Sequence, residues 1–312
     1  MGMSVSSQRH GSMGVLHSAL KNAFWLVGLE VVRKRSYETM LKRFHDEIRA
    51  LREESEYLRA ATWEYQLKLE RKDDYQTIMA QNQVRAGMAD LEAEFLELYV
   101  QCREYTMTSW ERLYALHQAV LYILANDIPG DFVECGVWRG GSMRLVAMTL
   151  MKEGVKDRTL YLYDTFQGMT KPGQLDVDLY GNPAINDWDQ VQRRKVKWAY
   201  APIEEVRKTI MSTGYPMNRV VLVEGPVETT IPRTIPERIA LLRLDTDWYQ
   251  STKHEIEHLY PRLSTEGILA IDDYGHYAGA RQAIDEFFSR THRKPLLHRT
   301  DYACRFAVKP RE

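Results

Sequence analysis

The stretch 240–249, Ala-Leu-Leu-Arg-Leu-Asp-Thr-Asp-Trp-Tyr, places a short apolar run directly before Asp245 and Asp247. A second stretch, 267–274, has the sequence Gly-Ile-Leu-Ala-Ile-Asp-Asp-Tyr and ends in the same way. Short apolar runs with these boundaries are typical of buried parallel strands. An unpaired buried charge is costly, so we expect acids at two such strand ends to share a compensating partner. Clustered carboxylates suit a hard divalent cation such as Mg2+, and the two stretches therefore predict a metal site at the mouth of a parallel sheet.

Toward the N-terminus, a predicted strand at 131–135 is followed by a glycine-rich turn and a helix expected over 143–152. A strand, a glycine turn and a helix in this order can bind a polar cofactor, because free N–H groups point outward at the helix N-terminus. Glu134, just before the turn, would repel a pyrophosphate but suits an ammonium group, which favours S-adenosylmethionine over a dinucleotide. Glycines in such turns also serve simply to pack a helix on a strand. The residues of the turn that we expect at the cofactor are Gly136, Gly140, Gly141 and Ser142.

Two further strand ends complete the predicted cofactor pocket. The strand 158–163 ends at Asp164, whose carboxylate is placed to accept hydrogen bonds from ribose hydroxyls. The alternative is that Asp164 only caps the turn into Phe166. The strand 219–223 ends next to Gly225, and this edge would approach the adenine.

The long connection 167–216 is expected to form a lid, because connections of this length in compact domains are usually functional. Helices are predicted within it at 188–200 and 203–211. Four aromatic residues of the connection could line an acceptor pocket, with core packing as the alternative for each: Tyr180, Trp188, Trp198 and Tyr200. After the second acidic stretch, a helix is expected over 278–288, and the strands 295–299 and 304–308 are predicted as an antiparallel edge pair.

The N-terminal third is expected to be an appendage to this sheet. Residues 1–14 are rich in Ser and Gly and are predicted to be disordered, and 15–74 is predicted to be helical. From Leu41 to Leu69, apolar positions alternate three and four residues apart, as in a coiled coil. We favour a homo-oligomer formed through these helices over packing of the segment on its own domain. Residues 75–129 are predicted to be a helical cap, with one helix at 78–102 and another at 113–126.

Composition narrows the class of partner and the compartment. The 312 residues include 42 basic and 43 acidic side chains, and the pI is about 6.8, so nothing in the overall charge favours a nucleic-acid partner. Three scattered cysteines without CxxC spacing indicate neither a disulfide framework nor a zinc site, which favours the cytoplasm. No apolar run is long enough to span a bilayer. Trp25 and Leu26, beside basic residues, could make a peripheral membrane contact, although burial against helices of the same chain is favoured.

Taken together, these motifs resemble the macrocin O-methyltransferase family, whose members are S-adenosylmethionine- and Mg2+-dependent enzymes that methylate hydroxyls on sugars of glycosides. The resemblance is carried by 105–109, 130–142, 163–166, 244–247 and 271–275, and it extends over about 94–309. It implies an α/β fold of the class I methyltransferase type, Rossmann-like, with a mostly parallel sheet over residues 130–312. It also implies a glycan or glycoside as the acceptor.

The resemblance further implies roles for individual residues. Asp245, Asp272 and Asp273 would ligate Mg2+, and Asp247 would be the general base. Because Asp245 and Asp247 are two residues apart, they can reach one site only if the chain turns after the strand. His276 is the competing base, or else it orients a metal ligand.

The segment 105–109 also carries two hydroxyl residues, Thr108 and Ser109. A helix N-cap explains most of their signal. We also expect both of them at the cofactor.

Simpler explanations and other functions remain for the acids. Asp247 could cap the following helix, and the pair Asp272-Asp273 could begin the helix at 278–288. A nucleotide-sugar glycosyltransferase would use Asp245-Thr246-Asp247 to hold a metal on a diphosphate, but it would leave Glu134 and the glycine turn without a role. A non-catalytic scaffold acting through the coiled coil is the third interpretation.

Overall fold

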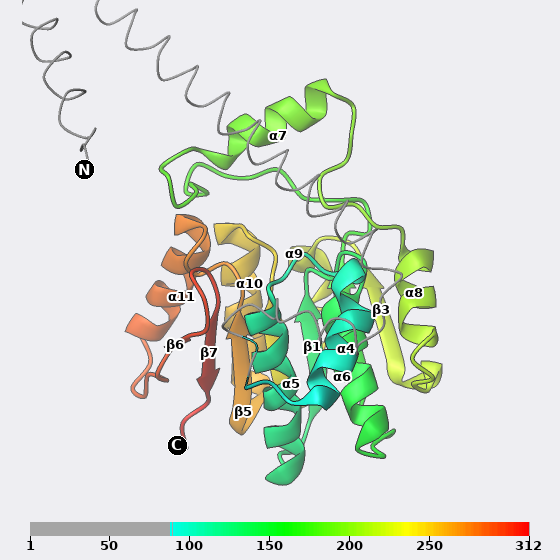
Figure 1. Ribbon diagram of the computed structural model, residues 1–312. Coiled ribbons are helices and arrows are strands. Elements are labelled where there is room, and N and C mark those ends of the chain that lie inside the picture. Colours follow the sequence, from blue (N-terminus) through cyan, green and yellow to red (C-terminus); the bar gives the residue numbers. More distant parts are fainter. Residues whose placement is uncertain (1–87, 89, 312) are drawn as a thin grey trace, which may run out of the picture. The chain divides into compact units, whose positions relative to one another are not determined.

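The computed structural model describes residues 88 and 90–311, which form a seven-stranded sheet with helices on both faces (Figure 1). All of the described residues belong to one unit of the chain, Arg85–Glu312. The predictions for residues 1–14, for the coiled coil within 15–74, for self-association and for membrane contact through Trp25 and Leu26 lie outside the described residues. In the part of the chain that is described, no helix is both long and apolar enough to cross a membrane.

Five parallel strands and two antiparallel strands make up the sheet, in the order β3-β2-β1-β4-β5-β7-β6. The predicted α/β class, with a mostly parallel sheet and an antiparallel edge, is confirmed. From β1 the next strands in the chain, β2 and β3, are added on one side, and from β4 the later strands are added on the other side. In such sheets, ligands bind beyond the carboxyl ends of the two strands where the direction changes, here β1 and β4. The strands are β1 Asp131–Cys135, β2 Leu160–Asp164, β3 Val220–Glu224, β4 Ile239–Leu244, β5 Leu263–Ile271, β6 His298–Arg299 and β7 Arg305–Val308.

Helices cover both faces of the sheet. α5 (Trp110–Ala125), α6 (Gly141–Lys152) and α8 (Ile203–Met211) lie on one face, with α4 (Ala93–Cys102) packed on α6. The opposite face carries α9 (Val227–Thr230), α10 (Tyr249–Leu259) and α11 (Ala278–Ser289). Short 3-10 turns lie at Arg103–Tyr105, Met217–Arg219 and Tyr260–Arg262. Beyond the carboxyl ends of the parallel strands lies α7 (Ala184–Arg193), within the predicted lid (Figure 1).

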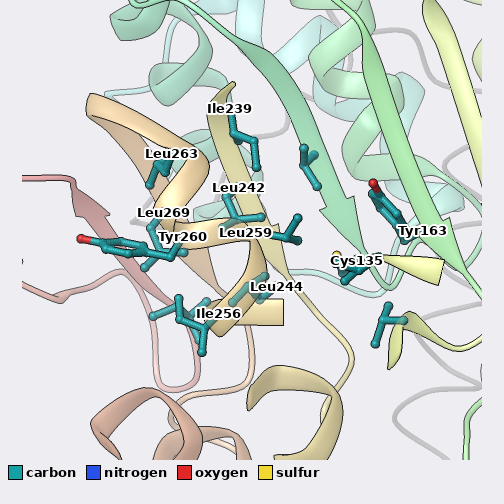
Figure 2. Packing of buried hydrophobic residues seen from close by; sticks show 14 of the residues in the cluster. Cys135, Tyr163, Ile239, Leu242, Leu244, Ile256, Leu259, Tyr260, Leu263 and Leu269 are labelled. Carbon is teal, nitrogen blue, oxygen red and sulfur yellow. The ribbon is translucent and has the colours of Figure 1, made fainter. Parts of the chain in front are cut away.

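The core explains why the apolar run at 239–244 is nearly continuous. Every residue of β4 is buried, because neighbouring strands flank it and helices cover both of its faces. On one face Leu242 and Leu244 pack in a cluster with Ile256 and Leu259 of α10 (Figure 2). Arg243, 4% exposed, is the one charged residue of this strand.

Several predicted boundaries were wrong. Of the helix expected at 78–102, residues 78–87 lie outside the described residues, and the described part is the helix α4, which begins at Ala93. Glu92 is extended there, and the Leu91 N–H donates to the Met88 carbonyl in a turn. The lid helix expected at 188–200 is instead α7, and the positive φ of Lys195 and of Ala199 keeps the helix from continuing.

Both edge strands are shorter than expected, and the helix expected at 143–152 starts two residues earlier, at Gly141. The helix expected at 113–126 likewise begins earlier, at Trp110. Differences of this size are common at the ends of helices and strands.

A buried carboxyl in α10 gives the fold a pH dependence. Glu255 is fully buried; one oxygen accepts a hydrogen bond from Thr246 Oγ1 at 2.8 Å, and the other has no partner among the described residues. Burial raises the pKa of Glu255 from 4.5 to about 8. Between these values the folded state binds more protons than the unfolded chain, so stability falls as pH rises through this window, by up to about 1.4 kcal/mol per pH unit.

We therefore expect Glu255→Gln to reduce this fall, because glutamine does not ionise. Urea denaturation at about pH 6 and about pH 9 measures the effect, with the exposed Glu237→Gln as the control. The free energy of unfolding of the wild type and of the control should drop more than that of Glu255→Gln. An equal drop in all three proteins would show that Glu255 is not the group responsible.

Candidate active site

One cavity of about 260 Å³ lies at the carboxyl ends of the central strands. Most of the predicted site residues line it: Thr108, Glu134, Gly136, Ser142, Asp164, Gly225, Asp245, Asp247, Asp272, Asp273 and His276. Three do not: Ser109, Gly140 and Gly141. The predicted cofactor pocket and the predicted metal site are therefore parts of the same cavity.

The acids that follow β4 and β5 meet because of the register between these strands. Leu244 pairs with Ile271, and the Asp272 N–H donates to the Leu244 carbonyl, so the next residues of both strands leave the sheet at the same level. Ligand oxygens of Asp245, Asp272 and Asp273 all lie within 4.8 Å of one another.

Asp247 joins this group through the turn that the sequence requires. Its φ of +66° is in the left-handed region, where side chains other than glycine are uncommon, and it redirects the chain after the strand. The capping alternative for Asp247 is wrong, since Trp248 is the N-cap residue of α10 and the Tyr249 N–H donates to Asp176 from the lid. The N-cap residue of α11 is Tyr277, so Asp272 and Asp273 do not occupy that position either.

The electrostatics of the cluster favour a bound cation. Burial raises the pKa of Asp245, of Asp247 and of Asp273 well above the usual range, and repulsion from the neighbouring carboxylates raises each further. Arg243 opposes the shift at Asp245. Three oxygen donors gathered in a partly dehydrated cavity fit a hard divalent cation, which would supply the missing positive charge.

The site also contains two arginines that were not predicted from the sequence. Arg243 contacts Glu134, Asp245 and Asp272 at 2.5–2.6 Å, and Arg112 contacts Asp272 and Asp301. A charged residue inside the apolar run at 240–244 was the available signal for Arg243, because a buried guanidinium requires carboxylate partners. Arg112 lies in the first turn of α5, where no sequence pattern distinguishes it from a solvent-exposed residue.

The cofactor side of the cavity contains an acid with one unused oxygen. Glu134 is 1% exposed; Oε1 accepts a hydrogen bond from Arg243, and Oε2 has no partner among the described residues. Burial raises the pKa of Glu134 to about 7, while Arg243 opposes this shift. A buried carboxylate oxygen at the wall of a cavity fits the ammonium group of an amino-acid-bearing cofactor.

Asp164 holds the glycine turn in place. Oδ2 accepts hydrogen bonds from the Val137 and Trp138 N–H groups at 2.8 and 3.0 Å, and Oδ1 accepts one from the Phe166 N–H at 2.7 Å. The capping alternative is therefore present in the structure. Carboxylate oxygens can accept more than one hydrogen bond, so these contacts leave Asp164 able to accept from a ribose hydroxyl as well. Ribose contact stays a prediction.

The glycines of the turn mainly allow close packing. A Cβ on Gly136 would lie 1.8 Å from the Asp245 carbonyl oxygen, and one on Gly141 would lie 2.6 Å from the Tyr105 backbone. The packing interpretation thus applies at Gly141. Gly140 does not line the cavity either, and its φ of +85° is a backbone conformation that favours glycine. Gly136 lines the cavity and also lets β1 approach the chain that carries the first acid.

Gly136→Ala should therefore destabilise the fold by roughly 3 kcal/mol or more, because the new Cβ collides with fixed backbone. Gly181→Ala is the matched control: φ is +87° there and +84° at Gly136, but nothing lies within 4 Å of the added Cβ. Urea denaturation of both variants separates the collision from the backbone strain. Equal losses of stability would contradict the packing role of Gly136.

The segment before α5 supplies one hydroxyl to the cavity and one to the helix. Ser109 Oγ accepts a hydrogen bond from the Arg112 N–H at 3.3 Å, which confirms the N-cap, and donates one to Asp301 at 3.2 Å. Thr108 lines the cavity, with Oγ1 3.4 Å from Arg243 Nη2. Only Thr108 is placed to meet a ligand.

The lid and His276 close the other side of the cavity. Gly168, Met169, Thr170 and Ala199 line it, and the Trp248 indole N–H donates to the Thr170 carbonyl at 2.9 Å, which fixes the lid to α10. None of the four aromatic residues proposed for an acceptor pocket lines the cavity, and Trp198 packs against Trp248 instead.

His276 Nδ1 lies 3.4 Å from the Tyr302 hydroxyl, and burial lowers the pKa of His276.

A cavity with a glycine turn on one side and an oxygen-ligand cluster on the other, at the strand ends of this sheet, is the arrangement expected of an S-adenosylmethionine-dependent O-methyltransferase. The model of the family described as Macrocin-O-methyltransferase (TylF) matches residues 37–309. The chain belongs to this family.

Individual relatives support the assignment. The chain is 33% identical over 183 residues to demethyldecarbamoylnovobiocin O-methyltransferase of Streptomyces niveus, covering 59% of this chain and 67% of that protein. It is 32% identical over 186 residues to mycinamicin III 3''-O-methyltransferase of Micromonospora griseorubida, covering 60% and 71%. Among solved structures, the O-methyltransferase NovP superposes with a TM-score of 0.59 at 30% identity, covering 66% of this chain and 83% of that one. The match to a family of methyltransferases contradicts both the glycosyltransferase interpretation and the non-catalytic scaffold interpretation.

Proposed function

We propose that this protein transfers a methyl group from S-adenosylmethionine to a hydroxyl on the sugar of a glycoside, in a reaction that depends on Mg2+. One observation carries the proposal: three carboxylates within 4.8 Å of one another share a cavity with the glycine turn and the unpaired oxygen of Glu134. The similarity to a novobiocin-precursor and a mycinamicin methyltransferase supports a glycoside acceptor.

The proposed roles follow from where each group lies. Asp245, Asp272 and Asp273 would hold Mg2+, which when bound lowers the pKa of a sugar hydroxyl and fixes its position. Asp247, beside Asp273 in the same cavity, accepts the hydroxyl proton. Alignment of the hydroxyl oxygen with the sulfonium methyl group supplies much of the remaining rate.

The cofactor would lie along the glycine turn. Glu134 Oε2 would receive the ammonium group, Asp164, which holds the turn, would accept hydrogen bonds from the ribose, and Gly225 would lie at the adenine edge. His276 remains the second candidate for the base, since it lines the cavity but has Nδ1 directed to Tyr302.

Chelation provides the direct test of the function. Transfer of radiolabelled methyl from S-adenosylmethionine to a panel of glycosides is expected to stop with EDTA and to recover when Mg2+ is added in excess. Binding of S-adenosylhomocysteine, followed by calorimetry in the same EDTA buffer, should persist, because the cofactor groups are distinct from the metal groups. Methyl transfer that continues in EDTA would refute the metal dependence, and methylation restricted to non-sugar hydroxyls would refute the acceptor class.

A further inference from the structure

Arg243 occupies the boundary between the two halves of the cavity. It lies in β4, paired with β1 on one side and β5 on the other, and is opposite Glu134 and Ala270 in those strands. The side chain is 4% exposed, and its guanidinium lines the cavity. Burying this charge is tolerated only with well-placed partners, and these partners come from both sides of the site.

The two terminal nitrogens of the Arg243 guanidinium donate to three different acids. Nη1 donates to Glu134 Oε1 at 2.5 Å and to Asp245 Oδ2 at 2.6 Å. Nη2 donates to Asp272 Oδ1 at 2.6 Å, with Thr108 Oγ1 at 3.4 Å. Glu134 thus belongs to the cofactor side and the two aspartates to the metal side, yet one rigid planar group sets the position of all three.

At Glu134 and Asp245, the contact with Arg243 uses one carboxylate oxygen and leaves the other for a ligand. Glu134 retains Oε2, which has no partner among the described residues, and Asp245 retains Oδ1. Asp272 is held at both oxygens, by Arg243 at Oδ1 and by Arg112 at Oδ2, so its rotamer is fixed from two sides. The free oxygens and remaining lone pairs are those that a ligand can use.

We infer that Arg243 is a positioning residue that orients the cofactor acid Glu134 and the metal ligands Asp245 and Asp272 as one unit. This inference rests on the proposed function, since it requires both ligands. A lysine cannot replace the arginine, because a single ammonium cannot match the fork that spans three carboxylates. Losing a residue that orients metal ligands typically costs about 10- to 100-fold in metal affinity.

The arrangement offers matched controls on either side. Arg112 is bonded to Asp272 and to Asp301, but not to Glu134, so Arg112→Lys should weaken metal binding alone. Glu134→Gln should weaken cofactor binding alone. Arg243→Lys is the one substitution of the three expected to weaken both.

Two binding measurements on the full-length protein test the inference without reference to turnover. Mn2+ affinity is measured by electron paramagnetic resonance, and S-adenosylhomocysteine affinity by calorimetry in EDTA. For Arg243→Lys we expect both dissociation constants to rise by roughly 10-fold or more, with an unchanged number of sites per folded protein. A purely structural role would reduce the number of competent sites and leave the dissociation constants as they are.

The contrary outcomes are distinct. If Arg243→Lys weakens only one ligand, or neither, the inference is wrong although the proposed function stands. If the wild type binds S-adenosylhomocysteine but no Mn2+, the proposed metal site fails and the inference fails with it. If neither Arg243→Lys nor Arg243→Gln folds, the guanidinium serves the fold rather than the ligands, which also overturns the inference.

Discussion

Replacing Asp273 by Asn should lower kcat/KM for methyl transfer by a factor on the order of 10³, corresponding to the several kcal/mol that a metal contributes to such a reaction. The substitution removes one of three proposed ligands. Among the described residues, Asp273 has no ion pair with an arginine of the kind that holds Asp272 and Asp245, and its side-chain hydrogen bond is to Asp247. Asn has the same shape and retains one oxygen. The measurement is initial-rate kinetics at saturating and at limiting Mg2+.

Binding of S-adenosylhomocysteine should stay within a few fold of the wild type in this variant, because the residue lies on the metal side of the cavity. Asp285→Asn, an exposed acid in α11, is the control for the loss of one negative charge. Near-normal turnover of Asp273→Asn at ordinary Mg2+ concentrations would mean that the residue is not a ligand. Loss of cofactor binding instead would show that the two halves of the site are wrongly assigned.

Asp247→Asn should reduce kcat by about 10² to 10⁴, the usual contribution of a positioned general base. The φ of +66° favours Asn as the replacement, since Asn adopts the left-handed region more readily than most other residues. Affinity for Mn2+ and for S-adenosylhomocysteine should change little. Turnover with saturating Mg2+ and cofactor measures the effect.

His276→Gln is the comparison that assigns the base. Its ring has Nδ1 directed to Tyr302, and we expect a much smaller loss of kcat than for Asp247→Asn. The reverse ranking would transfer the role to His276. Equal losses in both variants would indicate that they share the proton, and Asp247 could not then be named as the sole base.

Much of the fold could be predicted because the central strands have strong local signals. The runs ending at Leu244 and Ile271 are almost wholly apolar and stop at aspartates, which is the pattern of strands covered on both faces. The convergence of Asp245 with Asp272 followed from the same pattern, because neighbouring parallel strands end at one edge.

The rest depends on contacts between distant parts of the chain. In the sequence, Arg243 is an isolated charge, because its partners lie in β1 and just after β5. The glycine turn could not reveal that Gly141 packs against the backbone of Tyr105 rather than against a ligand. The aromatic residues of the lid carry no sequence signal for direction, and Trp198 packs inward on Trp248 while Tyr180 is 73% exposed.

We propose that aspartates from two strand ends hold one cation beside the methyl donor. Anomalous diffraction from crystals grown with Mn2+ and S-adenosylhomocysteine tests this arrangement most directly. We expect one Mn2+ peak bonded to oxygens of Asp245, Asp272 and Asp273, with the cofactor along the Gly136–Ser142 turn of the same cavity. A Mn2+ peak elsewhere, or a cofactor bound outside that cavity, would contradict it.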